Sequence, residues 1–241
     1  MPALKALLFD LDGTLVNTGP LIIEAFRYTA KMVFNLDAPP RELIAAVGTP
    51  LASQMEGLVE RYFGERLPVD GKLAHTKEEL VAQLRDVYRE YCARVHDEYI
   101  LPYEGIETVL QNFAKRGVPM GVVTSKIHRS AVADLAYYDL GKYFQILVGA
   151  DDVTEHKPLP APLLKGMELL AAQHEICLTP KDCAYIGDSP FDTQAGNSAG
   201  MYTVAVTYGL FEQDVLFDQH PQEMLSSPGE LAHLNELISV Y

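Results

Sequence analysis

Two aspartates, Asp10 and Asp12, directly follow a short apolar run near the start of the chain. Side chains two positions apart in an extended chain point the same way, so both carboxylates can face one site. Gly13 lets the chain turn sharply after them. A lone Asp-x-Asp is common in solvated loops. Here, however, the apolar run predicts a strand that ends at the carboxyl edge of a sheet, where α/β folds bind ligands.

Two further signals follow later apolar runs or turns. Thr124 and Ser125 end one such run, where hydroxyl and backbone N–H groups can bind phosphate oxygens. Lys157 precedes Pro158, which predicts a lysine held at the start of a helix and projecting over the sheet edge. Each signal is weak alone, because Thr and Ser end many strands and a lone lysine is usually solvated.

The fourth signal is a pair of acids after another apolar run. Asp188 follows the run directly, and Asp192 lies four residues later, where it can look back from the first turn of a helix. Mg²⁺ prefers carboxylate and water oxygens, so Asp188 beside Asp10 and Asp12 predicts a magnesium site. Helix N-capping is a fair alternative for Asp192 but a poor one for Asp188.

Together the four signals supply the parts that phosphoryl transfer needs. A carboxylate can act as the nucleophile, while a metal ion and a lysine neutralise charge on the phosphoryl oxygens. A second carboxylate can protonate the leaving oxygen and then activate water. The ordered set therefore predicts a phosphatase, although no single member decides it.

Short apolar runs and helical patterns predict the scaffold that positions these residues. Continuous apolar runs that do not alternate are typical of strands covered by helices on both faces. Helical spacing recurs between them, with Gly117 placed to end the first helix. The pattern predicts a doubly wound, parallel α/β sheet. The predicted strands are 4–9, 120–124, 146–148, 183–186 and 203–206, and the helices between them include 106–113 and 162–172.

The stretch from about residue 18 to residue 96 contains helical patterns and no convincing strand. The expected helices are 21–34, 41–47, 51–63 and 77–95. A helical block inserted after the first strand is the simplest explanation. We therefore expect an α/β core at residues 1–17 and 98–241 and an all-helical domain at residues 18–97.

Composition limits the partners. A net charge of −14 without a basic stripe repels nucleic acid, so we expect no nucleic-acid partner. An anionic substrate then needs local positive charge, which a divalent cation and one or two lysines would supply. Three cysteines without CxxC spacing, and no segment of membrane-spanning length, predict a cytoplasmic protein with no membrane partner. We expect a monomer or homodimer.

The motifs resemble those of the haloacid dehalogenase-like hydrolase superfamily. The DLDGTL sequence at residues 10–15, followed by GDSxxD at 187–192, is specific to it. The chain is most similar to the helical-cap subgroup, which includes phosphoglycolate phosphatases, bacterial pyrophosphatases and β-phosphoglucomutases. The resemblance implies that residues 18–97 form a cap that largely sets substrate choice.

The resemblance also implies a role for each motif residue. Asp10 matches the nucleophile, Asp12 the general acid and base, and Lys157 the lysine that steadies nucleophile and phosphate. Thr124 and Ser125 match the phosphate-binding motif, with Gly13 beside the substrate. The metal would be Mg²⁺, held by Asp10, Asp188 and the backbone carbonyl of Asp12, and Asp192 would be a supporting acid.

Departures from related subgroups narrow the reaction. Dehalogenases lack the second aspartate, so Asp12 counts against dehalogenation. Related mutases carry a cap histidine where this chain has Ile22, which disfavours a mutase. The predicted cap loop at 47–50 has no Arg or Lys to bind a substrate carboxylate. Lys126, Arg129 or His128 can supply such a cation from the core side, but we favour the interpretation of each as a solvated surface residue.

The leading hypothesis is therefore a magnesium-dependent phosphatase of a small phosphorylated metabolite, resembling phosphoglycolate phosphatase. Inorganic pyrophosphatase is the nearest alternative, because that substrate needs little from the cap, and a β-phosphoglucomutase-like mutase comes next. Receiver domains also combine acids, magnesium, Thr and Lys. They are about half as long as this chain, have no cap insertion and carry the acceptor aspartate on a later strand.

Overall fold

The computed structural model describes residues 3–37, 39–64, 76–99 and 101–239. The chain divides into two compact units, one formed by Met1–Asn17 with Leu101–Tyr241 and the other by Thr18–Ile100. The second unit is thus inserted into the first between two nearby points.

A six-stranded parallel sheet forms the centre of the first unit, with the strand order β5-β4-β1-β6-β7-β8. Strand β1 lies between β4 and β6, so the N-terminal strand is internal to the sheet. The strands are β1 (Ala6–Phe9), β4 (Met120–Val123), β5 (Ile146–Val148), β6 (Cys183–Gly187), β7 (Tyr202–Val206) and β8 (Glu223–Leu225).

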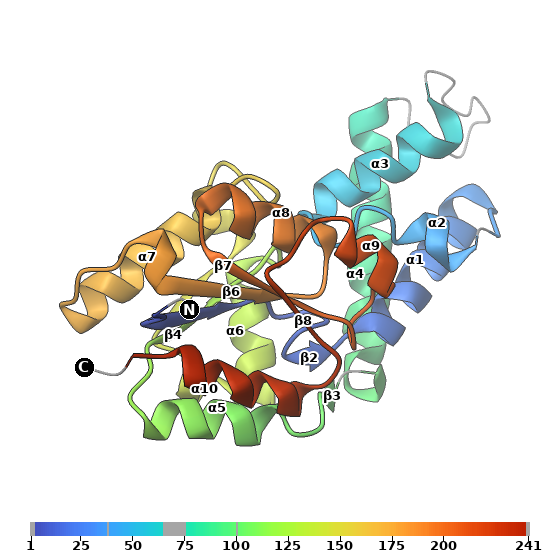
Figure 1. Cartoon of the computed structure of the whole chain (residues 1–241). Helices are drawn as coiled ribbons and strands as arrows, with labels where there is room; N and C mark the ends of the chain where they lie inside the picture. The colour runs from blue at the N-terminus through green and yellow to red at the C-terminus, as the bar shows by residue number, and fades with distance from the viewer. Residues whose placement is uncertain (1–2, 38, 65–75, 100, 240–241) are drawn as a thin grey trace. The chain divides into compact units, whose positions relative to one another are not determined.

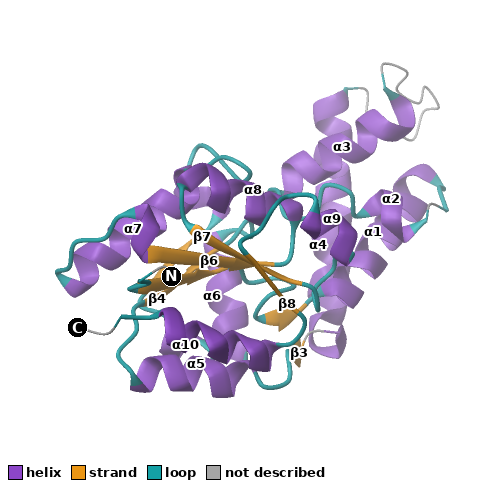
Figure 2. Ribbon diagram, in the orientation of Figure 1, coloured by secondary structure: helices purple, strands orange, loops and turns teal. Residues whose placement is uncertain are grey.

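Helices cover both faces of this sheet, as Figures 1 and 2 show. Helices α7 (Ala161–His174) and α8 (Pro190–Ala199) lie over one face, and α5 (Ile106–Lys115) and α10 (Leu234–Leu237) lie below the other. Burial on both faces explains the continuous apolar strands, because every position of β1, β4 and β6 is buried. The predicted doubly wound parallel core is confirmed.

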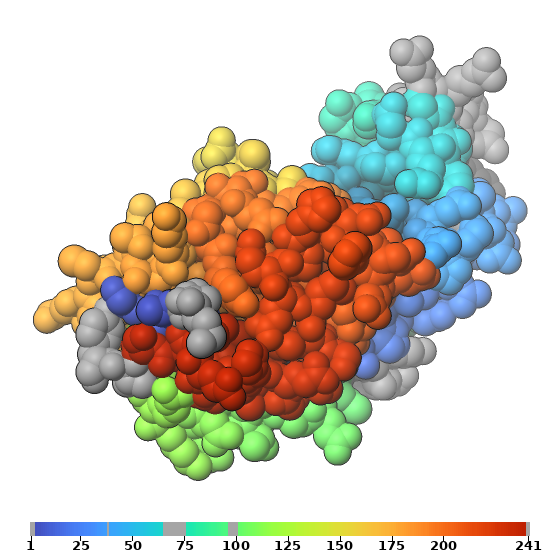
Figure 3. Space-filling model, viewed as in Figure 1, coloured from blue at the N-terminus to red at the C-terminus, as the bar shows by residue number. Residues whose placement is uncertain are grey.

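One apolar core lies beneath α7 and α8. It joins Leu8 of β1 and Val123 of β4 to Leu163 and Leu170 of α7. In the space-filling view, α7, α8 and the C-terminal segment cover most of the face that is shown (Figure 3). This packing holds the carboxyl ends of neighbouring strands at fixed positions.

Five predicted strands correspond to β1, β4, β5, β6 and β7, and three short strands were missed. Strand β8 lies at the sheet edge, and its three residues, Glu-Met-Leu, do not form an apolar run like that of β5. Strands β2 (Val16–Asn17) and β3 (Leu101–Pro102) form a two-residue antiparallel pair in the first unit. The remaining helices of this unit are α6 (His128–Tyr137) and α9 (Gln213–Phe217), with short 3₁₀ turns between elements.

The second unit contains four helices in its described part: α1 (Gly19–Phe34), α2 (Pro40–Leu43), α3 (Leu51–Phe63) and α4 (Lys77–Tyr99). Aromatic contacts join them, with Phe26 against Tyr88 and Phe34 against Phe63. Helix α2 is shorter than the predicted 41–47, because residues 44–49 form successive turns and Gly48 adopts φ 102°. No helix in the described ranges has the length and apolarity needed to cross a bilayer.

Candidate active site

The first and fourth motifs lie side by side at the carboxyl edge of the sheet. Phe9 of β1 is in register with Ile186 of β6, and the Asp10 N–H donates to the Ile186 carbonyl at 2.8 Å. Asp10 and Asp188 therefore leave adjacent parallel strands in the same direction. The turn at Gly13 passes so close to Asp188 that a Cβ at Gly13 would lie 2.1 Å from Asp188 Oδ2.

Lys157 connects the candidate nucleophile to the supporting acid. Its Nζ lies 3.0 Å from Asp10 Oδ1 and 2.6 Å from Asp192 Oδ1, with the lysine side chain 1% exposed. The predicted position of Lys157 at a helix start is wrong, because α7 begins only at Ala161. Lys157 lies in the preceding loop, before a cis peptide bond to Pro158.

Both carboxylate oxygens of Asp192 accept hydrogen bonds from neighbouring residues. It is the third helical residue of α8, and Ser189 is the N-cap of that helix in a capping box. Oδ2 accepts from the Ser189 N–H and hydroxyl at 3.0 and 2.6 Å. Oδ1 accepts from Lys157 and is 3.1 Å from the Tyr185 hydroxyl. These contacts suit an acid that positions Lys157.

Asp188 is held by the loop that follows β7. Leu210 donates its backbone N–H to Asp188 Oδ2 at 2.8 Å. Gly209 lies against the same side chain, and a Cβ built there would be 2.3 Å from Asp188 Cβ. The Tyr208 hydroxyl donates to the Thr14 carbonyl at 3.1 Å and ties this loop to the turn of the first motif. The loop therefore fixes where the Asp188 carboxylate can go.

We expect Gly209→Ala to displace Asp188 and weaken metal binding at this edge. The added methyl must push a Cβ rather than a flexible side-chain end, so the loop or Asp188 has to shift. The Mg²⁺ concentration for half-maximal activity should rise about tenfold, the range found for residues that orient metal ligands. Gly229→Ala is the matched control, because its Cβ meets nothing within 4 Å. Equal magnesium dependence in both variants would contradict the prediction.

Burial sets the electrostatics of the cluster. Burial raises the pKa of Asp10 to about 7, against the opposing effect of Lys157. Burial, with the nearby charges of Asp192 and Asp10, raises the pKa of Asp188 well above its usual range. Burial alone would lower the pKa of Lys157, but Asp10 and Asp192 hold it above its ordinary value. The site therefore buries three acids beside one lysine, and full ionisation of these acids requires further positive charge.

Asp12 makes a different contact from Asp10. Its Oδ1 lies 2.8 Å from Lys126 Nζ, and the same ammonium lies 2.5 Å from Asp134 Oδ2. The interpretation of Lys126 as a solvated surface residue is wrong. Its side chain is 22% exposed and bridges two carboxylates.

The candidate phosphate-binding residues follow β4, the other neighbour of β1. Thr124 is buried, and its hydroxyl oxygen accepts the Lys126 N–H at 3.2 Å. Ser125 is half-buried and comes next in the chain. Because β4 pairs in parallel with β1, both residues leave the sheet at the same edge as Asp10. All the residues predicted for the site thus lie in the first unit.

The donor set fits a divalent cation. Oxygen atoms of Asp10, Asp188 and Asp192 lie within 4.8 Å of one another, and all three residues are buried. Buried carboxylates need a compensating cation, and hard oxygen ligands suit Mg²⁺. The sequence-based set named Asp10, Asp12 and Asp188. The structure adds Asp192 to the cluster and turns the Asp12 carboxylate toward Lys126. Since both Asp192 oxygens already accept hydrogen bonds, Asp10 and Asp188 are the better ligands.

Three contributors to the site were missed by the sequence analysis. Tyr185 of β6 lies under Lys157, with its hydroxyl 3.1 Å from the lysine Nζ and 2.9 Å from the Val123 carbonyl. The others are Lys126 with Asp134, and the Tyr208–Leu210 loop. Side chains alternate between the two faces along a strand, so Tyr185 and Gly187 of β6 lie on the same face of the sheet. This spacing is a sequence signal that could have placed Tyr185 near the fourth motif. The remaining contacts depend on tertiary packing.

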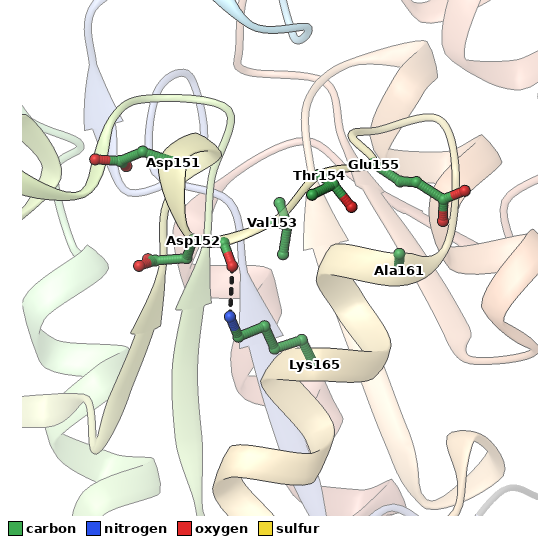
Figure 4. A pocket seen from close by; sticks show the side chains of 7 residues that line it. All are labelled: Asp151, Asp152, Val153, Thr154, Glu155, Ala161 and Lys165. Atoms are coloured by element: carbon green, nitrogen blue, oxygen red, sulfur yellow. Dashed lines mark hydrogen bonds between the residues drawn. The ribbon is translucent and has the colours of Figure 1, made fainter.

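A separate hollow lies in the loop between β5 and α7. Figure 4 shows Lys165 reaching the Asp152 carbonyl across it, at 2.5 Å. Its volume is about 400 Å³. The lining contains none of the predicted site residues and comprises Asp151, Asp152, Val153, Thr154, Glu155, Ala161 and Lys165. Lys165 therefore braces the loop that leads to Lys157.

Comparison with known families agrees with this geometry. The family model described as haloacid dehalogenase-like hydrolase matches residues 7–206, a span that runs from β1 to β7 and includes all four motifs. The chain belongs to this family. As a haloacid dehalogenase-like hydrolase with named phosphatase relatives, it is an enzyme acting on phosphate compounds. The members of this family generally use a metal ion.

Several relatives of known name span the same length. The protein named pyrophosphatase PpaX of Halalkalibacterium halodurans is 31% identical over 95% of this chain and 95% of its own. That of Bacillus mycoides is 30% identical over the same shares. Among solved structures, one described as a predicted phosphoglycolate phosphatase from Haemophilus somnus has a TM-score of 0.81 at 22% identity, covering 96% and 98% of the two chains. That likeness supports the fold of this hydrolase.

Proposed function

We propose that this protein is a magnesium-dependent phosphatase that hydrolyses inorganic pyrophosphate through a phospho-aspartate at Asp10. The buried contact between Asp10 and Lys157, beside Asp188 on the next strand, carries the proposal. It combines a fixed carboxylate nucleophile with the charges that phosphoryl transfer needs. The pyrophosphatase relatives at about 30% identity favour the substrate.

In the first step, an Asp10 carboxylate oxygen attacks phosphorus and forms a new oxygen–phosphorus bond. The bond from phosphorus to the bridging oxygen breaks, and that oxygen leaves with the electron pair and accepts a proton from Asp12. Lys157 keeps Asp10 in place through its contact at Oδ1. Thr124 and Ser125 bind the phosphoryl oxygens through hydroxyl and N–H groups.

In the second step, water attacks the same phosphorus while the Asp12 carboxylate accepts its proton. The bond between phosphorus and the Asp10 oxygen breaks, so inorganic phosphate leaves and the Asp10 carboxylate is restored. Asp12 regains the proton that it gave in the first step, and the cycle is complete. The two carboxylates therefore need separate positions and separate roles.

Asp10, Asp188 and the Asp12 backbone carbonyl would hold Mg²⁺, which supplies positive charge to the phosphoryl oxygens when bound. Tyr208 and Leu210 keep the loop next to Asp188 in place. Asp192 acts through Lys157, because its own oxygens are already hydrogen-bonded.

The sequence of the second unit gives no cation at the 47–50 turn that would select a carboxylate-bearing phosphate ester. The 47–50 turn has no lysine or arginine. Within this turn, the Thr49 hydroxyl donates to the Ala46 carbonyl at 2.7 Å. The choice of pyrophosphate as substrate therefore rests on the pyrophosphatase relatives at about 30% identity. We propose that residues 18–97 form the cap and that residues 1–17 and 98–241 form the catalytic core.

A substrate panel with metal removal tests this function. Phosphate release should be fastest with pyrophosphate, and slower with phosphoglycolate, glucose phosphates and nucleotides. Chelation of divalent cations should reduce the rate by at least about a hundredfold, and Mg²⁺ should restore it. Equal rates with and without divalent cations would contradict the metal mechanism. Faster phosphate release from phosphoglycolate than from pyrophosphate would contradict the proposed substrate.

A further inference from the structure

Two lysines divide the acids of the active site between them. Lys157 bridges Asp10 and Asp192 at 3.0 and 2.6 Å, and Lys126 bridges Asp12 and Asp134 at 2.8 and 2.5 Å. In each group, a lysine joins a candidate reacting carboxylate to a second acid on a helix of the core. None of the four sequence motifs predicted the contact of Lys126 with Asp12 and Asp134.

The chain holds Lys126 tightly on both sides. Its N–H donates to Thr124 Oγ1, and its carbonyl accepts from Ala150 N–H at 2.9 Å. Asp134 lies on α6 with its side chain 7% exposed. Burial alone would lower the pKa of Lys126, but Asp12 and Asp134 raise it above its usual range. A fixed ammonium beside Asp12 Oδ1 limits where that carboxylate can lie.

Charge explains why Asp12 needs such a contact. Asp10 and Asp12 leave the same strand end, next to Asp188 and Asp192, and like charges in a buried site repel. The Asp12 carboxylate is absent from the group of oxygens that gathers Asp10, Asp188 and Asp192 among the described residues. It pairs with Lys126 instead. Asp10 and Asp12, which belong to the same motif, therefore pair with different lysines.

We propose that Lys126, held by Asp134, is a positioning residue that fixes Asp12 for proton transfer. The proposal rests on the proposed function, in which Asp12 gives a proton to the leaving oxygen and takes one from water. A general acid or base must stay within hydrogen-bond reach of the atom it serves. Lys126 acts on the substrate through Asp12 and through no contact of its own.

Lys126→Met should lower kcat by about tenfold to a hundredfold, part of what a placed general acid and base contributes. KM should change by less than about threefold, because ground-state binding uses other groups. Lys126→Arg should recover part of kcat, since a guanidinium can still bridge Asp12 and Asp134. Asp134→Asn should give a smaller loss in the same direction.

Lys142→Met is the matched control for the ion pairs. Lys142 also bridges two carboxylates, those of Asp139 and Glu107, but at the surface. Its kcat and KM should equal those of the wild type. A general loss of folding in the Lys126 variant would appear as a large fall in melting temperature, which Lys126→Arg would not share.

The decisive measurement is a double-mutant cycle with Asp12→Asn. If Lys126 acts through Asp12, Lys126→Met should change kcat by less than about threefold in the Asp12→Asn background, since interacting sites are non-additive. The Lys126→Met enzyme should also accumulate phospho-enzyme during turnover, visible by intact mass, because water activation is slowed. A full multiplicative loss in that background would overturn the proposal, as would a Lys126→Met kcat equal to that of the wild type.

Asp10→Asn separates this inference from the function on which it rests. An Asp10→Asn variant that turns over pyrophosphate like the wild type would overturn the proposed function. An inactive Asp10→Asn variant together with a fully active Lys126→Met variant would overturn the role of Lys126 alone.

Discussion

Replacing Asp10 by Asn should reduce phosphate release from pyrophosphate by at least about 10⁴-fold, because an amide cannot form the phospho-enzyme. The change is nearly isosteric, and Asn can still accept a hydrogen bond from Lys157 at the position of Oδ1. The fold should therefore remain intact. Intact mass measured during turnover should show no added phosphoryl group.

The stability of the Asp10→Asn variant provides an independent readout. Burial raises the pKa of Asp10 from 3.8 to about 7, so ionised Asp10 costs folding free energy as pH rises through that range. Asn carries no charge at any pH. Without metal, the melting temperature of the variant relative to the wild type should therefore rise between about pH 4 and 7. Retained turnover, or a phosphorylated Asn variant, would contradict the assignment of the nucleophile.

The sheet was predictable because its strands are buried on both faces. Such strands lose the alternation of polar residues, and β1, β4 and β6 do so completely. Each ends at a residue that can do chemistry, and parallel pairing brings those ends to one edge. The proximity of Asp10 and Asp188, which follow the paired strands β1 and β6, was predictable from this logic. The β2–β3 pair was too short to carry a pattern, and β8 begins with Glu223 and so does not form an apolar run.

The contacts of individual charges were less predictable. Lys126 is next to Ser125 in the chain, and only the placement of α6 brings Asp134 to the other side of its ammonium. The Lys157 loop differs from the predicted helix start for a similar reason. Proline after Lys157 fits a helical first turn, but the helix begins at Ala161. Local sequence preference indicated a lysine near the edge, and tertiary packing decided what it contacts.

Lys157→Met should be the most destabilising single change in the active site. It leaves the buried acids Asp10 and Asp192, which lie next to Asp188, without their shared cation, and removing one partner of a buried ion pair costs about 3–5 kcal/mol. Activity should fall by about a hundredfold to a thousandfold, because a fixed charge beside the phosphoryl group is lost. Urea unfolding and phosphate release measure the two effects separately.

The pH and metal dependence of this destabilisation identify its cause. Lys157 lowers the pKa of Asp10 against the effect of burial. Without this lysine, the neighbouring acids repel one another most strongly when they are ionised. The loss of stability should therefore grow as pH rises through about 7 and shrink as the acids become protonated. Saturating Mg²⁺ should restore part of the stability, since it supplies charge to the same carboxylates. Lys142→Met, which removes a surface lysine with two acidic partners, should show neither trend. A loss of stability that is equal at pH 5 and 8, with and without Mg²⁺, would reflect lost packing and would remove the electrostatic role of Lys157.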